Sequence, residues 1–137
     1  MELHPDEARE LFATARVARL ATVGSDGAPH IVPICFALAG GTVYSAVDGK
    51  PKRTPALARL RNIDSEPRVA LLADHYDEDW ARLWWVRLDG KARLVSGTRE
   101  REQALRALTE RYAQYRDCAP QGAVIAVEPV RWVGWRA

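Results

Sequence analysis

Residues 42–64, T-V-Y-S-A-V-D-G-K-P-K-R-T-P-A-L-A-R-L-R-N-I-D, join a predicted strand, a basic loop and a predicted helix. The β-branched and aromatic residues of 42–47 predict the strand. Thr54 and Pro55 form a helix start, with Thr54 at the N-cap and Pro55 at the first helical position. Between strand and helix lies a loop with three cationic side chains, those of Lys50, Lys52 and Arg53.

The predicted helix has an apolar stripe of Leu57, Leu60 and Ile63, and Arg59 and Arg61 are expected to face away from it. Backbone N–H groups at a helix start and nearby cations attract anions. The segment therefore predicts a phosphate-binding site. A solvated loop that is basic by chance is the alternative, because charge runs usually lie on wet surface.

Working outward, the sequence predicts about seven strands in sequential hairpins. Gly-containing turns are expected at 24–27, 40–41 and 89–90, and Glu128-Pro129 is expected to separate the last two strands. Pro33 cannot donate a ladder hydrogen bond, so its strand must be an edge strand or bulged there. Strands are predicted at 17–23, 30–38, 68–73, 83–88, 91–96, 123–127 and 130–135, and helices at 5–15 and 98–115, in addition to those of 42–64.

This pattern predicts a mainly β (α+β) protein, a small antiparallel β-barrel with peripheral helices. The sequence has no β-α-β alternation, and no G-x-G-x-x-G motif follows the first strand. Both absences argue against a Rossmann domain. An antiparallel meander of this length has to close or pair its edges. With 137 residues, a single domain over 1–137 is expected.

Composition excludes several partners. The net charge of +2 predicts no nucleic-acid binding, so any anion affinity has to be local. No apolar run approaches the roughly 20 residues of a membrane span, and the acidic start is unlike a secretory signal, so a cytoplasmic protein is expected. Two cysteines, Cys35 and Cys118, are too few for a disulfide scaffold or metal motif, and Cys35 is expected to be a buried small hydrophobe.

Little catalytic chemistry is visible among the side chains. The histidines are far apart and have no metal-ligand spacing, and no nucleophile motif is present. An anion site in a barrel without an acid–base pair predicts that a bound cofactor carries the chemistry. If the reaction requires a proton donor, His30 and Tyr44 are the candidates, and the sequence assigns no catalytic residue.

The run A-R-L-A-T-V-G-S-D-G-A-P-H-I-V-P-I, residues 18–34, resembles the opening strands of split β-barrel flavin-binding proteins related to pyridoxamine 5′-phosphate oxidase. The segments V-Y-S-A-V-D-G-K-P-K-R, L-R-N-I, P-R-V-A-L-L-A-D and W-W-V-R-L-D-G-K-A-R-L continue the resemblance in order over nearly the whole chain. The terminal R-W-V-G-W-R-A looks like the branch that uses the deazaflavin coenzyme F420.

The resemblance implies a homodimer of split barrels with cofactor sites at the subunit interface. It places the ring of the cofactor along one strand and its phosphate on the basic loop. The implied ring contacts are Ile31, Val32, Pro33, Ile34 and Cys35, and the implied phosphate contacts are Ser45, Lys50, Lys52, Arg53 and Thr54.

Two departures favour F420 over vitamin B6 oxidation. Residues 30–38 contain no Arg or Lys, and residues 131–134 do not match the Arg-x-x-Pro type of substrate signature. The cations of the basic loop suit the negatively charged phosphodiester and polyglutamate tail of F420. A flat apolar wall for the ring could come from Trp80, Trp84 or Trp85, and Trp80 is the favoured candidate. The prediction is an F420-dependent reductase that passes a hydride to a small organic substrate.

Two alternatives remain open. An FMN-binding oxidoreductase of the same fold could anchor its smaller phosphate on Lys52, Arg53 and Thr54. A non-enzymatic cofactor or tetrapyrrole carrier, or a dimeric structural protein, could use the same barrel.

Overall fold

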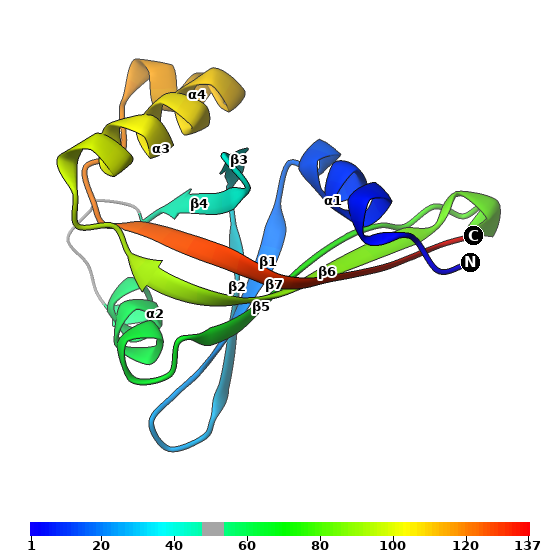
Figure 1. Ribbon diagram of the computed structural model, residues 1–137, viewed down its shortest axis with the longest axis horizontal. Helices are drawn as coiled ribbons and strands as arrows, with labels where there is room; N and C mark the ends of the chain where they lie inside the picture. The colour runs from blue at the N-terminus through cyan, green and yellow to red at the C-terminus, as the bar shows by residue number, and fades with distance from the viewer. Residues whose placement is uncertain (48–53) are drawn as a thin grey trace.

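The computed structural model describes residues 1–47 and 54–137, and the side chains of 54–57 also lie outside the description. Within these described residues, seven antiparallel strands form one sheet in the order β2-β1-β5-β6-β7-β4-β3, with four α-helices around it (Figure 1). The elements are α1 (Pro5–Thr14), β1 (Ala18–Val23), β2 (Pro29–Ile34), β3 (Ala37–Ala39), β4 (Thr42–Ala46), α2 (Thr54–Ser65), β5 (Arg68–His75), the 3₁₀ turn η1 (Trp80–Arg82), β6 (Trp84–Leu94), α3 (Thr98–Arg111), α4 (Ala113–Asp117) and β7 (Val124–Arg136).

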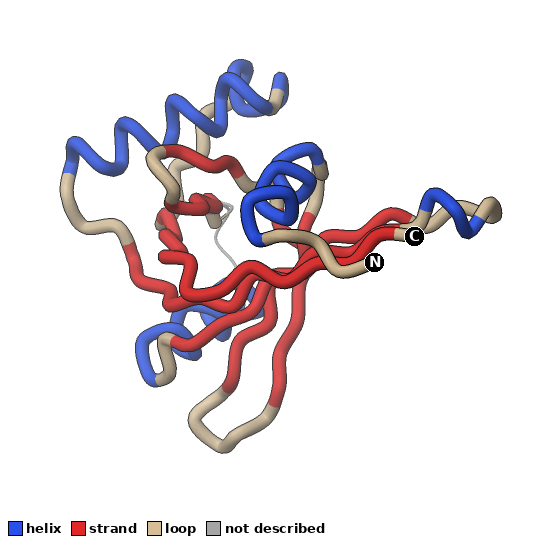
Figure 2. The backbone as a smooth tube through the Cα atoms, turned by 45° about the vertical axis from the view of Figure 1, so that its right-hand side comes forward, coloured by secondary structure: helices blue, strands red, loops and turns tan. Residues whose placement is uncertain are grey.

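The sheet is curled into a split barrel because its two edge strands are neighbours in the chain. β2 and β3 stand at opposite ends of the sheet order, yet only Cys35 and Phe36 separate them. A flat sheet of seven strands would be about 29 Å across, whereas so short a link spans at most about 10 Å. The two views agree on the resulting curl (Figures 1 and 2). The predicted mainly β split barrel with peripheral helices is confirmed.

The strand predicted over 30–38 is instead two strands, β2 and β3, which break at Cys35 and Phe36. The buried Phe36 ring fills the bend and packs on Phe12, with ring centroids 4.6 Å apart. Pro33 lies on β2, an edge strand, as its missing N–H predicted.

Two predicted breaks near the C-terminal half are absent. The chain runs straight through Asp89-Gly90 as part of β6, and through Glu128-Pro129 as part of β7. The two strands pair with each other along almost their whole length, and a register irregularity lies at Asp89/Gly90. Turn-type residues here mark a bulge between two long strands, not hairpins.

Beyond the barrel, β6 and β7 continue into an arm whose tip is the segment between β5 and β6 (Figure 1). Both chain ends lie beside this arm, and the Met1 ammonium donates to the Arg136 carbonyl at 2.7 Å. Among residues 1–47 and 54–137, no helix combines the length and apolar character that a membrane span requires.

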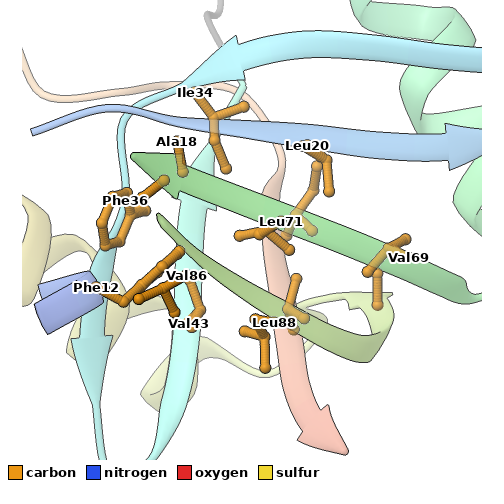
Figure 3. Packing of buried hydrophobic residues seen from close by; sticks show 14 of the residues in the cluster. Phe12, Ala18, Leu20, Ile34, Phe36, Val43, Val69, Leu71, Val86 and Leu88 are labelled. Carbon is orange, nitrogen blue, oxygen red and sulfur yellow. The ribbon is translucent and has the colours of Figure 1, made fainter. Parts of the chain in front are cut away.

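The core fills the curl of the sheet. Side chains from α1, the barrel strands and the β2–β3 link meet in one cluster (Figure 3). Phe12, Leu20, Phe36, Leu71 and Leu88 are completely buried there. Alternating buried positions along β1 and β5 supply this face, as period-two patterning requires.

The predicted helix over 98–115 is divided at Tyr112, whose extended backbone ends α3 and starts α4. The buried Tyr112 hydroxyl accepts a hydrogen bond from the Phe36 N–H at 3.1 Å. It also lies 3.0 Å from the carbonyl oxygens of Phe36 and Arg16, its acceptors. One side chain thereby fixes the end of α3 to the bend between the two sheet edges.

Replacing Tyr112 by phenylalanine is expected to lower the free energy of unfolding by about 1.5 kcal/mol, because buried backbone groups lose their partner. Urea denaturation measures the change. Tyr76→Phe is the control, since Tyr76 is 62% exposed. Equal effects of the two variants would contradict the structural role of the Tyr112 hydroxyl.

Candidate functional site

A cavity of about 760 Å³ opens beside the ends of β2 and β4. Its walls come from these two strands, α2, α4 and the segment after α4. The lining residues are Pro33, Ile34, Cys35, Ser45, Ala46, Val47, Arg59, Gln114, Tyr115, Cys118, Ala119, Pro120 and Gln121. This volume falls within the range of small-molecule and cofactor pockets.

The floor of the cavity is fixed by a contact between β4 and the end of β2. The Ser45 hydroxyl donates to the Cys35 carbonyl at 2.8 Å and is itself buried. β4 is also paired with β7, where Ser45 stands opposite Ile125. The strand ends that line the cavity are therefore held on a rigid sheet, as a preorganised site needs.

Arg59 is the single charged residue among the described residues that line the cavity. It extends from α2, half-buried, and its Nε is enclosed without a hydrogen-bond acceptor among the described residues. Burial lowers the pKa of the guanidinium. A desolvated cation in a cavity whose described lining carries no carboxylate fits an anionic group.

The sequence predicted that Arg59 and Arg61 would face away from the apolar side of α2. Arg61 is exposed, whereas Arg59 lines the cavity. Ile63 is buried and Leu60 packs against the core, as predicted. Leu57, the third residue of the predicted stripe, has its side chain outside the description. The spacing of the stripe did not reveal that the neighbouring Arg59 borders the cavity.

The structure brings together four of the predicted cofactor contacts, namely Pro33, Ile34, Cys35 and Ser45. Ile31 is 63% exposed and Val32 packs partly against the core, and both lie outside this lining. Lys50, Lys52 and Arg53 lie outside the described residues. Thr54 is the first residue of α2, and its side chain also lies outside the description. Their phosphate contacts stay predictions.

Trp80 does not line this cavity. It lies in η1, between β5 and β6, and is 67% exposed. A second cavity of about 460 Å³, nearer to Trp80 in sequence, lies on the arm and includes Trp84 and Trp85 in its lining. Within one chain, the predicted tryptophan wall and the β2–β4 cavity are therefore separate.

The surroundings of the two cysteines, of His30 and of Tyr44 could not be predicted from the sequence. Cys35 is exposed in the cavity wall and not buried, because the strand ends before it, and Cys118 lines the same cavity. His30 has an enclosed Nδ1 without a partner among the described residues. The buried Tyr44 donates its hydroxyl to Glu100 at 2.7 Å, and it does not line the cavity. This contact weakens the case for Tyr44 as a proton donor.

Outside the cavity, Glu100 is part of a network with Arg93 and Tyr44. Arg93 reaches both carboxylate oxygens of Glu100, at 2.7 and 2.8 Å, and also binds Glu128. Hydrogen bonds from Arg93, and then from Tyr44, lower the pKa of Glu100 to about 2. The network links α3 to β4, β6 and β7.

A pH dependence of stability follows from this lowered pKa. The stabilisation is complete above the ordinary pKa of about 4.5 and is lost as pH falls toward about 2. Because the network is open to solvent, we expect Glu100→Gln to cost about 1 kcal/mol at pH 7 and less at pH 2.5. Denaturation midpoints at both pH values test this, with the exposed Glu102→Gln as control. A cost that does not shrink in acid would contradict it.

Comparisons with known proteins agree with this architecture. The chain matches the family "Pyridoxamine 5'-phosphate oxidase" over residues 4–136. No match was found among curated proteins. Among solved structures, the chain is similar to the conserved hypothetical protein Rv2991 from Mycobacterium tuberculosis, with 20% identity, a TM-score of 0.80, and coverage of 98% of this chain and 85% of that one.

Two further structures have different ligands in their names. The FAD binding protein from Mycobacterium smegmatis shares 25% identity, with a TM-score of 0.72 and coverage of 99% and 98% of the two chains. HutZ, the heme storage protein from Vibrio cholerae, shares 17% identity, with a TM-score of 0.72 and coverage of 98% and 95%. The family match spans almost all residues, so the chain belongs to the pyridoxamine 5′-phosphate oxidase family.

Proposed function

We propose that the protein is a cofactor-dependent oxidoreductase that uses coenzyme F420, with FMN as the alternative, to transfer a hydride to or from a small organic substrate. The observation that carries the proposal is the β2–β4 cavity, where Arg59 is the one charged side chain of the described lining and its Nε has no hydrogen-bond acceptor among the described residues. A flavin-type cofactor joins a flat ring to an anionic tail, and the described lining of this cavity offers an apolar wall beside the half-buried positive charge of Arg59. Support also comes from a structural relative named for binding FAD.

The residues of the chain bind and orient in this proposal, and the bound cofactor would supply the hydride chemistry. Pro33, Ile34 and Cys35 would border the ring, and Arg59 would hold an anionic group. The Ser45 hydroxyl already donates to the Cys35 carbonyl, so it would act on the cofactor mainly as an acceptor or by positioning that strand.

The preference for F420 rests on the basic loop and on the absence of a cation in β2. A polyglutamate tail presents several negative charges, and Lys50, Lys52 and Arg53 follow one another in the sequence before α2. Each exposed pair contributes about 1 kcal/mol or less, so the binding of a tail by several pairs should weaken with added salt. FMN has a single phosphate and should depend less on salt.

We also propose a homodimer with the cofactor at the subunit interface. Large apolar side chains stay uncovered in the single chain, including Ile31 at 63% and Val130 at 68% exposure. A partner subunit would bring its own Trp80 toward the cavity, which Trp80 of the same chain does not line. Sedimentation at micromolar concentration tests this, and a monomer would contradict it.

The test of function is side-by-side titration of F420, FMN and haem into purified apo-protein at two salt concentrations. Tight, salt-sensitive F420 binding with weak FMN binding is the expected result, followed by a substrate screen with reduced F420. A preference for FMN would favour the flavin alternative. Binding of haem alone would favour a tetrapyrrole carrier, and binding of none of the three would overturn the proposal.

A further inference from the structure

A second cavity of about 460 Å³ lies on the arm and is lined largely by aromatic side chains. Asp74 and Tyr76 come from the β5 side, Leu83 and Trp85 from the β6 side, and Trp135 from β7. The lining includes His75 and Trp84 as well, the last residue of β5 and the first of β6, which are paired with each other.

The strand register makes this arrangement more specific. Asp74 stands opposite Trp85, Trp85 stands opposite Trp135, and Trp135 is bridged to Glu2. Directly paired residues of antiparallel strands lie on one face with their side chains adjacent. The arm therefore carries a continuous row in which two tryptophans stand between two carboxylates. We call the four residues Glu2, Trp135, Trp85 and Asp74 the arm row.

Of the two carboxylates of the arm row, Asp74 is held by one long ion pair and Glu2 by none among the described residues. Asp74 has a long contact to Arg19, 3.9 Å, in which both side chains are about half exposed. The nearby Arg87 is held by Asp89, with distances of 2.8 and 3.2 Å. Glu2 forms no ion pair with any residue of the described parts of the chain. Three more acids, Asp77, Glu78 and Asp79, follow Tyr76 in the sequence.

From this geometry we propose that the arm row binds a small organic cation, a quaternary or alkylated ammonium group. Tryptophan faces attract such cations more strongly than other aromatic side chains do. A large, weakly hydrated ammonium group suits an apolar aromatic surface, and the two flanking carboxylates compensate its charge. Within one chain the site lies apart from the β2–β4 cavity, and no residue that the structure describes lines both cavities.

The test is calorimetric titration of the full chain with choline and with its uncharged isostere, 3,3-dimethylbutan-1-ol. The two compounds have the same shape and differ in the central charge. We expect choline to bind at least about fivefold more tightly than the isostere, because only choline gains from the ring quadrupoles and carboxylates. Equal binding would show an ordinary apolar cavity and overturn the proposal, and so would no binding of choline.

Variants locate the binding. Trp135→Leu is expected to weaken choline binding about fivefold, and Asp74→Asn or Glu2→Gln about threefold each. Glu78→Gln is the matched control, because it removes one carboxylate from the same end of the arm without touching the arm row. An equal loss in Glu78→Gln and Asp74→Asn would mean diffuse attraction only. Unchanged choline binding in Trp135→Leu would overturn the assignment of the site. This holds whatever the variant does to the oligomeric state.

Discussion

Replacing Gly90 by valine is expected to lower the free energy of unfolding by about 3 kcal/mol or more, the largest stability effect predicted for this chain. A Cβ atom at Gly90 would stand 2.7 Å from the Glu128 carbonyl oxygen and 2.8 Å from Val127 Cγ1. The first of these atoms belongs to the backbone of β7, which is paired along β6 and cannot move alone. Urea denaturation followed by circular dichroism measures the loss.

Two further variants separate a steric effect from a general effect of losing a glycine. Gly90→Ala should already be destabilising, because the Cβ itself makes the clash. Gly97→Ala is the matched control, since a Cβ there meets no atom within 4 Å and Gly97 has φ of −87°. Its expected cost stays below about 1 kcal/mol, from the weaker helix cap. Gly90→Ala without loss of stability would contradict the close approach of β6 and β7.

The same glycine shows where prediction from the sequence succeeded and failed. Asp89-Gly90 has the composition of a hairpin turn, and the local sequence gives no sign that β7 lies against it. The barrel class itself was predictable, because alternating segments, an edge-type proline and missing β-α-β units all restrict the topology. The lengths of β6 and β7 depend on pairing between segments about 40 residues apart, which local patterns do not contain.

Some residues of the β2–β4 cavity were also predicted from the sequence, and others were not. The strand ends with Pro33, Ile34, Cys35 and Ser45 were predicted, because the family resemblance aligned them by residue. The position of Arg59 in the cavity wall and the contribution of α4 to that wall were not predicted, because both depend on how helices pack on the sheet. An arginine next to an apolar stripe was a possible signal, because the edge of a buried helix face often borders a cavity. The wall from Gln114 to Gln121 had no signal in the sequence.

Replacing Arg59 by leucine is expected to weaken cofactor binding by about 30-fold to 100-fold, the size of one lost hydrogen-bonded charge contact. Arg61→Leu is the matched control, because it removes the same charge from the same helix at an exposed position. Its effect should be about twofold and should disappear at high salt. Titration of both variants with F420 and FMN measures the difference. Equal losses in the two variants would show that only the general charge of the helix matters.

The Arg59→Leu variant can also be tested by its stability: we expect weaker cofactor binding together with a higher free energy of unfolding of the apo-protein. In the free protein the enclosed Nε of Arg59 has no partner among the described residues, which is unfavourable for folding. Arg59→Leu should therefore raise the free energy of unfolding of the apo-protein by about 1 kcal/mol, while it reduces the stabilisation that added cofactor provides. A structural arginine would lose apo stability on this change. Only a residue kept for a ligand combines a more stable apo-protein with weaker binding, so thermal unfolding with and without cofactor decides between the two roles.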